Sequence, residues 1–321
     1  MPQETVRLAE FGAALRYEDL PASVVQQAKD CIIDTVAAGI CGSAMPWSRI
    51  VIDYAERTGP GGKCRILGRG GRSVQAPAAA LANGALAHAF ELDSLTRPGA
   101  GAHPGATVLP PALAIAQERG AGGRALIAAF VAGNEVMIRI GRATGHTSEA
   151  RGFHAPGTTG PFGGAVAAGH LLRLDARAMT NALGIAGSLC GGLLEFARGD
   201  GGMVKRLHLG RASEAGVLAA SLAADGFAGP RTVIEGEFGF LRVFCTNWDL
   251  GELTRGLGNE FVVSSTVLKL CGAGHAPADV RQANHHLVCR TVLETCRPTE
   301  GMPRRSLEPP PRHRYHRRAA G

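Results

Sequence analysis

The amino-acid sequence predicts a mainly α fold: a large all-helical domain followed by the start of a smaller α+β domain that is incomplete. Apolar residues recur at helical spacing through most of the first 227 residues. Alanine and glycine dominate these stretches, and 45 of the 321 residues are glycine, about twice the usual share. Such small side chains are typical of helices that approach one another closely.

The predicted helices follow one another along the chain. The first long helix, 22–42, begins after Pro21 and carries apolar residues at helical spacing. A second, 47–57, ends where proline and glycine break the pattern, and 64–68 is short enough to be a strand or an extended connector. Further helices are expected at about 76–90, 105–119, 123–143, 161–172, 176–197 and 211–225, with Asp175 and Ser213 as N-caps or near-caps.

The pattern changes after residue 228. The β-branched run 261–270 predicts a strand that opens a new unit. Beyond about residue 281 the chain is rich in arginine, histidine and proline, so it cannot bury enough apolar surface to order itself. We therefore expect an all-helical domain over 1–265, a remnant of a lid domain over 266–281 and a disordered tail over 282–321.

Composition favours a soluble, cytoplasmic protein. The longest apolar runs, such as 125–132, fall far short of the roughly 20 residues that cross a bilayer. Residues 1–7 lack the charged-then-apolar pattern of a signal peptide. The eight cysteines form no CxxC pair, and most are expected to be reduced core residues. No membrane partner is predicted.

The net charge of +7 does not indicate a nucleic-acid-binding domain. Residues 282–321 hold eight arginines, no lysine and three glutamates, so they carry +5 of that charge. A nucleic-acid-binding arm remains the least favoured hypothesis, because the tail lacks interleaved aromatic residues and the domain lacks a basic face. That hypothesis requires the protein to bind DNA in a salt-dependent way.

Segment 91–106 is the most informative part of the sequence, because it places acids, an arginine and a histidine between two apolar helices. Titratable groups in such surroundings are costly to desolvate and usually have a function. His103 directly precedes Pro104, and proline is preferred at the first helical position. A helix N-terminus attracts anions, so we infer a site for an anionic small molecule. Ordinary loop or capping roles for Asp93, Ser94 and His103 are an equal alternative from this segment alone.

Three other segments repeat the pattern of a polar group just before a helix of small residues. His154 lies in 151–164, Lys205 lies in 201–212, and Lys269 and His275 frame the third segment. Together with 91–106, these motifs resemble the MmgE/PrpD family over about residues 5–280. That family includes 2-methylcitrate dehydratase, cis-aconitate decarboxylase and iminodisuccinate epimerase.

The resemblance implies a homodimer whose active site lies between a helical domain and an α+β lid, needs no metal or organic cofactor, and takes small polycarboxylates. Many members have adjacent aspartates where this chain has Glu91-Leu92-Asp93, which leaves the substrate open. By motif, the expected catalytic residues are Asp93, His103, His154 and Lys205, and the expected substrate-binding residues are Thr96, Lys269 and His275.

These residue types suit the family's reactions. Dehydration, decarboxylation and epimerisation all develop enolate-like charge beside a carboxylate, and histidine or a desolvated lysine can transfer protons near neutral pH. Asp93 can orient or stabilise a histidine. We expect His208 to be a turn residue, His88 a core or helix histidine and Met203 a packing residue. A metal site is not expected, since no histidine or cysteine cluster has ligand spacing before His285-His286.

The sequence therefore predicts a cofactor-independent lyase or isomerase, resembling 2-methylcitrate dehydratase, with cis-aconitate decarboxylase or iminodisuccinate epimerase activity as alternatives. The Lys269 motif is shorter than in the family, and hydrophobic periodicity is lost soon after it. A truncated or frameshifted member is expected on that basis. The competing hypothesis is a catalytically impaired fragment that keeps only the helical dimerisation domain.

Overall fold

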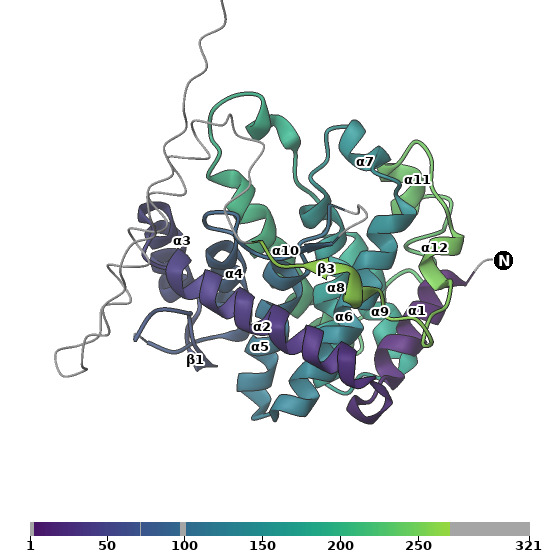
Figure 1. Cartoon of the computed structure of the whole chain (residues 1–321), viewed down its shortest axis with the longest axis horizontal. Coiled ribbons are helices and arrows are strands. Elements are labelled where there is room, and N and C mark those ends of the chain that lie inside the picture. Colours follow the sequence, from purple (N-terminus) through teal and green to yellow (C-terminus); the bar gives the residue numbers. More distant parts are fainter. Residues whose placement is uncertain (1–2, 71, 97–100, 270–321) are drawn as a thin grey trace, which may run out of the picture.

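The computed structural model describes residues 3–70, 72–96 and 101–269 (Figure 1). The α-helices are α1 (Glu4–Ala14), α2 (Ala22–Gly42), α3 (Pro46–Thr58), α4 (Ala76–Ala87), α5 (Pro104–Arg119), α6 (Gly123–Ala143), α7 (Thr147–Ala150), α8 (Ala155–Leu171), α9 (Ala176–Gly187), α10 (Val204–Ala224), α11 (Phe240–Phe244) and α12 (Gly251–Thr254). Three 3₁₀ turns and three short strands complete these ranges: η1 (Tyr17–Asp19), η2 (Leu194–Ala197), η3 (Val262–Ser265), β1 (Pro60–Cys64), β2 (Leu95–Thr96) and β3 (Thr266–Val267).

The mainly α class is confirmed, and the expected ranges 22–42 and 123–143 match α2 and α6. Two helices begin earlier than expected. Helix α8 starts at Ala155, because Pro156 occupies its first turn. Helix α10 starts at Val204, so Ser213 lies inside it and is not an N-cap; its hydroxyl donates to the Leu209 carbonyl at 2.9 Å.

Helix α9 has the predicted N-cap but ends sooner than expected. Asp175 accepts a hydrogen bond from the Ala178 amide at 2.7 Å, as a capping carboxylate does. The helix ends at Gly187 rather than near residue 197. Gly192 further along has φ +126°, a backbone conformation that ends any continuation of the helix.

The predicted strand over 261–270 is mostly wrong. Of the described part of this run, 261–269, only Thr266–Val267 forms a strand, which pairs antiparallel with β2 in the register Leu95↔Val267 and Thr96↔Thr266. The preceding residues curl into η3 because buried groups of α6 take their backbone hydrogen bonds. Glu135 accepts from the Val263 amide at 2.8 Å, and Arg139 donates to the Arg255 and Glu260 carbonyls at 2.6 and 2.9 Å.

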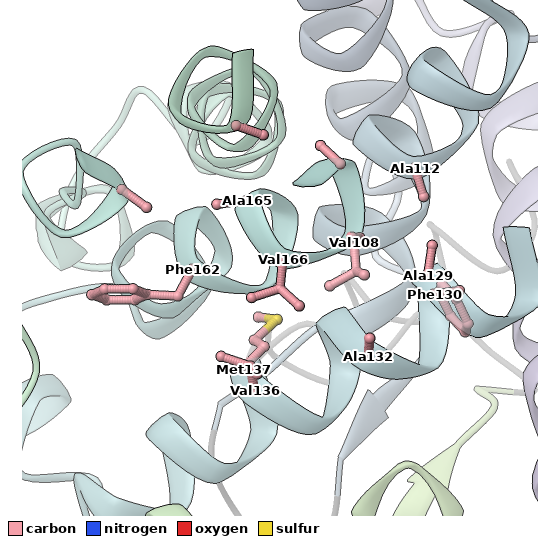
Figure 2. Close-up of a cluster of buried hydrophobic side chains, with 14 of the residues drawn as sticks. Val108, Ala112, Ala129, Phe130, Ala132, Val136, Met137, Phe162, Ala165 and Val166 are labelled. Atoms are coloured by element: carbon pink, nitrogen blue, oxygen red, sulfur yellow. The ribbon is translucent and has the colours of Figure 1, made fainter. Parts of the chain in front are cut away.

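Helix α8 lies at the centre of the bundle and packs against α5, α6, α9 and α10 (Figure 1). Its side chains are small, so the neighbouring helices come close. In Figure 2, Val108 of α5, Met137 of α6 and Val166 of α8 point toward one another, and all three are fully buried. Such close packing fixes the N-terminal ends of these helices relative to one another.

No single helix in the described ranges is long and apolar enough to cross a membrane. The pair α2 and α3 reaches that length and composition only together, with a bend of 98° between the two helices.

The crossing of α8 and α10 depends on two glycines, which gives a testable prediction for Gly216→Ala. A Cβ at Gly216 would lie 2.5 Å from the carbonyl carbon of Gly164, and backbone cannot move aside as a side chain can. We expect a loss of about 2–3 kcal/mol in the free energy of unfolding, as for overpacking, measured by urea denaturation. Gly123→Ala is the control, because nothing lies within 4 Å of its Cβ; it should change stability by about 0.5 kcal/mol or less. Equal stability of the two variants would contradict this account of the crossing.

Candidate active site

One cavity of about 1250 Å³ gathers the N-terminal ends of three helices. His103 caps α5, His154 caps α8, and Lys205 lies in the first turn of α10. Glu91 and Arg206 also line this cavity, beside Lys205. Helix N-termini present free N–H groups and a positive partial charge, so the cavity is suited to an anionic ligand.

His103 is oriented by Asp93. The His103 Nδ1 lies 2.8 Å from Asp93 Oδ2, while His88 Nδ1 lies 2.6 Å from Asp93 Oδ1. Burial alone would raise the pKa of Asp93, but the charges and hydrogen bonds of both histidines outweigh it and hold that pKa well below its usual value. Burial lowers the pKa of His103 to about 4, although Asp93 opposes that shift. His103 is therefore neutral at pH 7.

His154 contacts a second histidine. Its Nδ1 lies 3.0 Å from His208 Nδ1, so one ring donates an N–H and the other accepts it. The ring of Phe196 packs edge-on against His154 with centroids 5.1 Å apart. Burial, followed by the nearby His88, His103 and His208, lowers the pKa of His154 to about 2. The His154 imidazole is neutral at pH 7 as well.

Lys205 forms an ion pair with Glu91 at 2.6 Å, and both side chains are largely buried. Burial alone would raise the pKa of Glu91, but the charges of His88 and Lys205 lower it overall. Glu91 has φ +63°, a left-handed conformation that is costly for a residue with a side chain. Its carbonyl accepts a hydrogen bond from Lys269 Nζ at 2.9 Å. Glu91 thus contacts both Lys205 and Lys269. The sequence indicated only that Glu91 and Asp93 stand where many family members have two adjacent aspartates.

The structure brings His103, His154 and Lys205 together on the cavity wall, with Asp93 directly behind His103. Lys269 Nζ lies 4.0 Å from Asp93 Oδ1, and Thr96 is buried in β2 opposite Thr266; neither is among the residues that line this cavity. His275 lies outside the described residues, as does most of the expected lid remnant and the whole expected tail.

Three residues that the sequence analysis set aside have clear places in the structure. His208 lies on α10 and contacts His154, so its interpretation as a turn residue is wrong. Met203 is 56% exposed, which contradicts its interpretation as a packing residue. His88 is fully buried beside Asp93, as a core histidine should be, but its contact with the site was not foreseen. Its position fifteen residues before His103 gives no periodic signal.

Among the described residues, His88, Asp93 and His103 are the one group whose nitrogen and oxygen atoms lie close enough to suggest a cation site, within 4.8 Å of one another. Their short contacts are already explained by two hydrogen bonds to one carboxylate. The Lys269 ammonium lies 4.0 Å from the same carboxylate and would repel a second cation. The expectation of a metal-free site stays a prediction.

Mild acid should destabilise this protein, because His103 and His154 are held neutral. Their pKa values fall from 6.5 to about 4 and about 2 on folding, so below pH 6.5 the unfolded chain binds more protons. The stability present above pH 6.5 is lost as the pH falls, by about 2 kcal/mol per histidine at pH 5. Burial and the charge of Asp93 raise the pKa of half-buried Asp34 to about 6, so protonation of Asp34 restores part of this loss, reduced by solvent screening because the side chain is half exposed.

Urea denaturation at pH 7 and pH 5 measures this difference, for which we expect about 2–3 kcal/mol. His154→Gln should reduce it by about 2 kcal/mol. His146→Gln, at a histidine whose side chain is 53% exposed, should leave it unchanged. A free energy of unfolding that is the same at both pH values would show that these histidines are not held neutral by the fold.

Comparison with known proteins identifies the family. The sequence matches the MmgE/PrpD N-terminal domain over residues 6–253. Cis-aconitate decarboxylase of Aspergillus terreus is 31% identical over 291 residues, which cover 86% of this chain and 59% of that protein. The cis-aconitate decarboxylase-like protein oryM of Aspergillus oryzae is 32% identical over 281 residues, covering 83% of this chain and 58% of its own length. Human cis-aconitate decarboxylase is 31% identical over 231 residues, which cover 70% of this chain and 47% of that protein.

The match to these relatives therefore spans about three fifths of their length or less. The match to the family domain includes all three helix N-termini that meet at the cavity. Because the family domain covers more than half of the chain, the chain belongs to the MmgE/PrpD family.

Proposed function

We propose that this chain provides the helical part of a cofactor-independent lyase that acts on a small polycarboxylate by histidine and lysine acid–base chemistry. The observation that carries the proposal is the meeting of His103, His154 and Lys205 at one cavity. These three residues come from the starts of three different helices, far apart in the sequence. Proton-transferring and cationic side chains at helix N-termini fit a reaction that develops negative charge beside carboxylates.

Carboxylate binding would use Lys205, Arg206 and the helix N-termini. Lys205 is paired with Glu91. The Arg206 guanidinium donates to the Ala89 and Gly202 carbonyls, which keeps its positive charge at the cavity wall. A substrate carboxylate that reaches Lys205 competes with Glu91 for the ammonium.

Proton transfer would be coupled to binding. His103 and His154 are neutral without ligand, and neutral imidazoles avoid repelling Lys205 and Arg206. A bound polyanion stabilises the protonated form of a nearby imidazole, so its arrival raises the pKa of both histidines. One histidine then holds a proton that it can deliver to substrate carbon, while Asp93 stabilises the imidazolium of His103.

The relatives' names favour decarboxylation over dehydration and epimerisation, since those reported above are cis-aconitate decarboxylases or a protein like them. Decarboxylation of a β,γ-unsaturated acid breaks the bond from the α-carbon to the carboxylate and releases CO₂. The electron pair forms a new α,β double bond, and the former double bond takes one proton at the γ-carbon. The protonated histidine supplies that proton, and solvent restores it after product leaves.

A homodimer belongs to the same proposal. Three isoleucine side chains are largely exposed: Ile33 and Ile40 on α2 and Ile50 on α3. A second copy of the chain would cover these apolar side chains. Sedimentation velocity would detect this dimer, and a monomer at micromolar concentration would contradict it.

The direct test of function is turnover by the purified chain. CO₂ release from cis-aconitate, dehydration of 2-methylcitrate and conversion of iminodisuccinate should be measured in parallel. We expect decarboxylation of cis-aconitate, and we expect His103→Gln to abolish it because the proton-exchanging nitrogen is lost. Folded protein without turnover of any of the three acids would instead favour the alternative of a helical domain that has no activity by itself.

The role of Lys205 gives a further prediction. Lys205→Ala should weaken substrate binding or turnover by about 2–4 kcal/mol, as expected for loss of one buried charge partner. Helical content measured by circular dichroism should not change, because the Lys205 ammonium pairs with Glu91 and lies over the Phe196 ring at the cavity rather than in the helical core. Lys63→Ala, on the exposed end of β1, is the matched control. An unaltered rate in the Lys205 variant would exclude this lysine from substrate binding.

A further inference from the structure

We propose that His88 is a positioning residue which, acting through Asp93, fixes the orientation and the proton-exchanging nitrogen of His103. The inference rests on the proposed function, in which His103 exchanges a proton with substrate. His88 itself is not among the residues that line the cavity in the described part of the chain, so it acts only through the carboxylate.

The geometry is a buried carboxylate shared by two imidazoles. His88 follows the last residue of α4 as its C-cap, and both His88 and Asp93 are 0% exposed. Each carboxylate oxygen accepts from one ring, at 2.6 Å from His88 Nδ1 and 2.8 Å from His103 Nδ1. The two rings meet edge to face with centroids 4.9 Å apart. Asp93 is therefore held from both sides and cannot rotate without breaking one bond.

This arrangement determines which nitrogen of His103 is available. An ionised carboxylate only accepts hydrogen bonds, so both Nδ1 atoms must carry hydrogen. In neutral His103 the lone pair is then on Nε2, the nitrogen not used by Asp93, and His103 lines the cavity. If His88 did not donate to Oδ1, the carboxylate could turn, and the proton position on His103 would no longer be fixed.

His88 also divides the negative charge of Asp93. A carboxylate with two donors stabilises each imidazolium less than one that serves a single donor. Loss of the His88 donor should therefore make His103 easier to protonate. His103 also experiences Lys269 from the segment after β3, while Asp34 of α2 acts on Asp93 and His154 of α8 lies across the cavity. These groups are the same in every variant proposed below.

A second observation distinguishes His88 from an ordinary core histidine. Its Nε2 is buried and has no hydrogen-bond partner among the described residues. Buried polar atoms are rarely left unpaired, because desolvation without a partner is costly. A residue chosen only for packing would not need to be a histidine here. The Nδ1 bond to Asp93 accounts for its presence.

The test is nuclear magnetic resonance of protein labelled with ¹⁵N at histidine, with His103→Gln used to assign the His103 signals. We expect wild-type His103 to be protonated at Nδ1 and bare at Nε2. Asparagine can place an amide N–H near the position of the histidine Nδ1, so His88→Asn should preserve this pattern. His88→Leu removes the donor, and His88→Gln places its amide near the Nε2 position instead.

In both His88→Leu and His88→Gln, the titration midpoint of His103 should rise by about one pH unit, or its two nitrogens should show mixed tautomers. The glutamine variant keeps the test decisive if the leucine variant does not fold. An unchanged His103 tautomer and midpoint in either folded variant would overturn the proposal. A change in the His88 and His103 signals on adding EDTA would also overturn it, because a bound cation would then explain the cluster.

This measurement is independent of turnover. If the chain decarboxylates none of the three acids but His103 responds as expected, the proposed function fails and the positioning role of His88 stands. If the chain is active and His103 does not respond, only the positioning role fails.

Discussion

The arrangement of the site depends on the buried carboxylate of Asp93. An ion without exposure to water is tolerated only when hydrogen bonds and opposite charge replace its hydration. Here the replacement comes from His88 at the end of α4, His103 at the start of α5 and Lys269 from beyond β3. One side chain thus ties together three segments. If any of these three segments were misplaced, the buried carboxylate would lose a hydrogen bond or an opposite charge. The cost of burying Asp93 without its partners therefore fixes the position of His103.

A second buried group brings the far end of the described chain to this position. Arg139 and Glu135, both on α6, bind backbone groups between Arg255 and Val263. Arg142 adds a bond from its guanidinium to the Ser265 hydroxyl at 3.0 Å. The chain then reaches β2 as the short strand β3, with the Thr266 carbonyl accepting from Gln27 of α2. Lys269 owes its place beside Asp93 to this sequence of contacts rather than to a strand-forming tendency.

The helical elements could be predicted from sequence because their cause is local. Periodic small residues, Pro104 after His103 and the Asp175 cap each act within a few residues. The failures have long-range causes. The run 261–270 has strand-forming side chains, yet Glu135 of α6 binds the backbone of η3 (Val262–Ser265) within it, which no local pattern reveals. Likewise, predicting the contacts of His154 with His208 and of Asp93 with His88 requires knowing which helix ends meet in the fold. Motif resemblance named Lys205 but not His208 from the same segment 201–212, because the contact of His208 with His154 depends on how two helices pack.

The charge state of the cavity limits electrostatic repulsion at this site. Four ionised groups near its wall cancel as two ion pairs, Lys205 with Glu91 and Lys269 with Asp93. Burial keeps His103 and His154 neutral, and the other charged residues of the lining are of both signs: Arg198 and Arg206, with Glu149 and Glu195. If His103 and His154 were both protonated, their charges would repel each other and the nearby cations, and the folded state would be less stable. Keeping the histidines neutral until an anion arrives avoids that cost, and it makes protonation a consequence of binding. In the proposed reaction, the charge of a bound anion would raise the pKa values of these histidines and so favour the proton uptake.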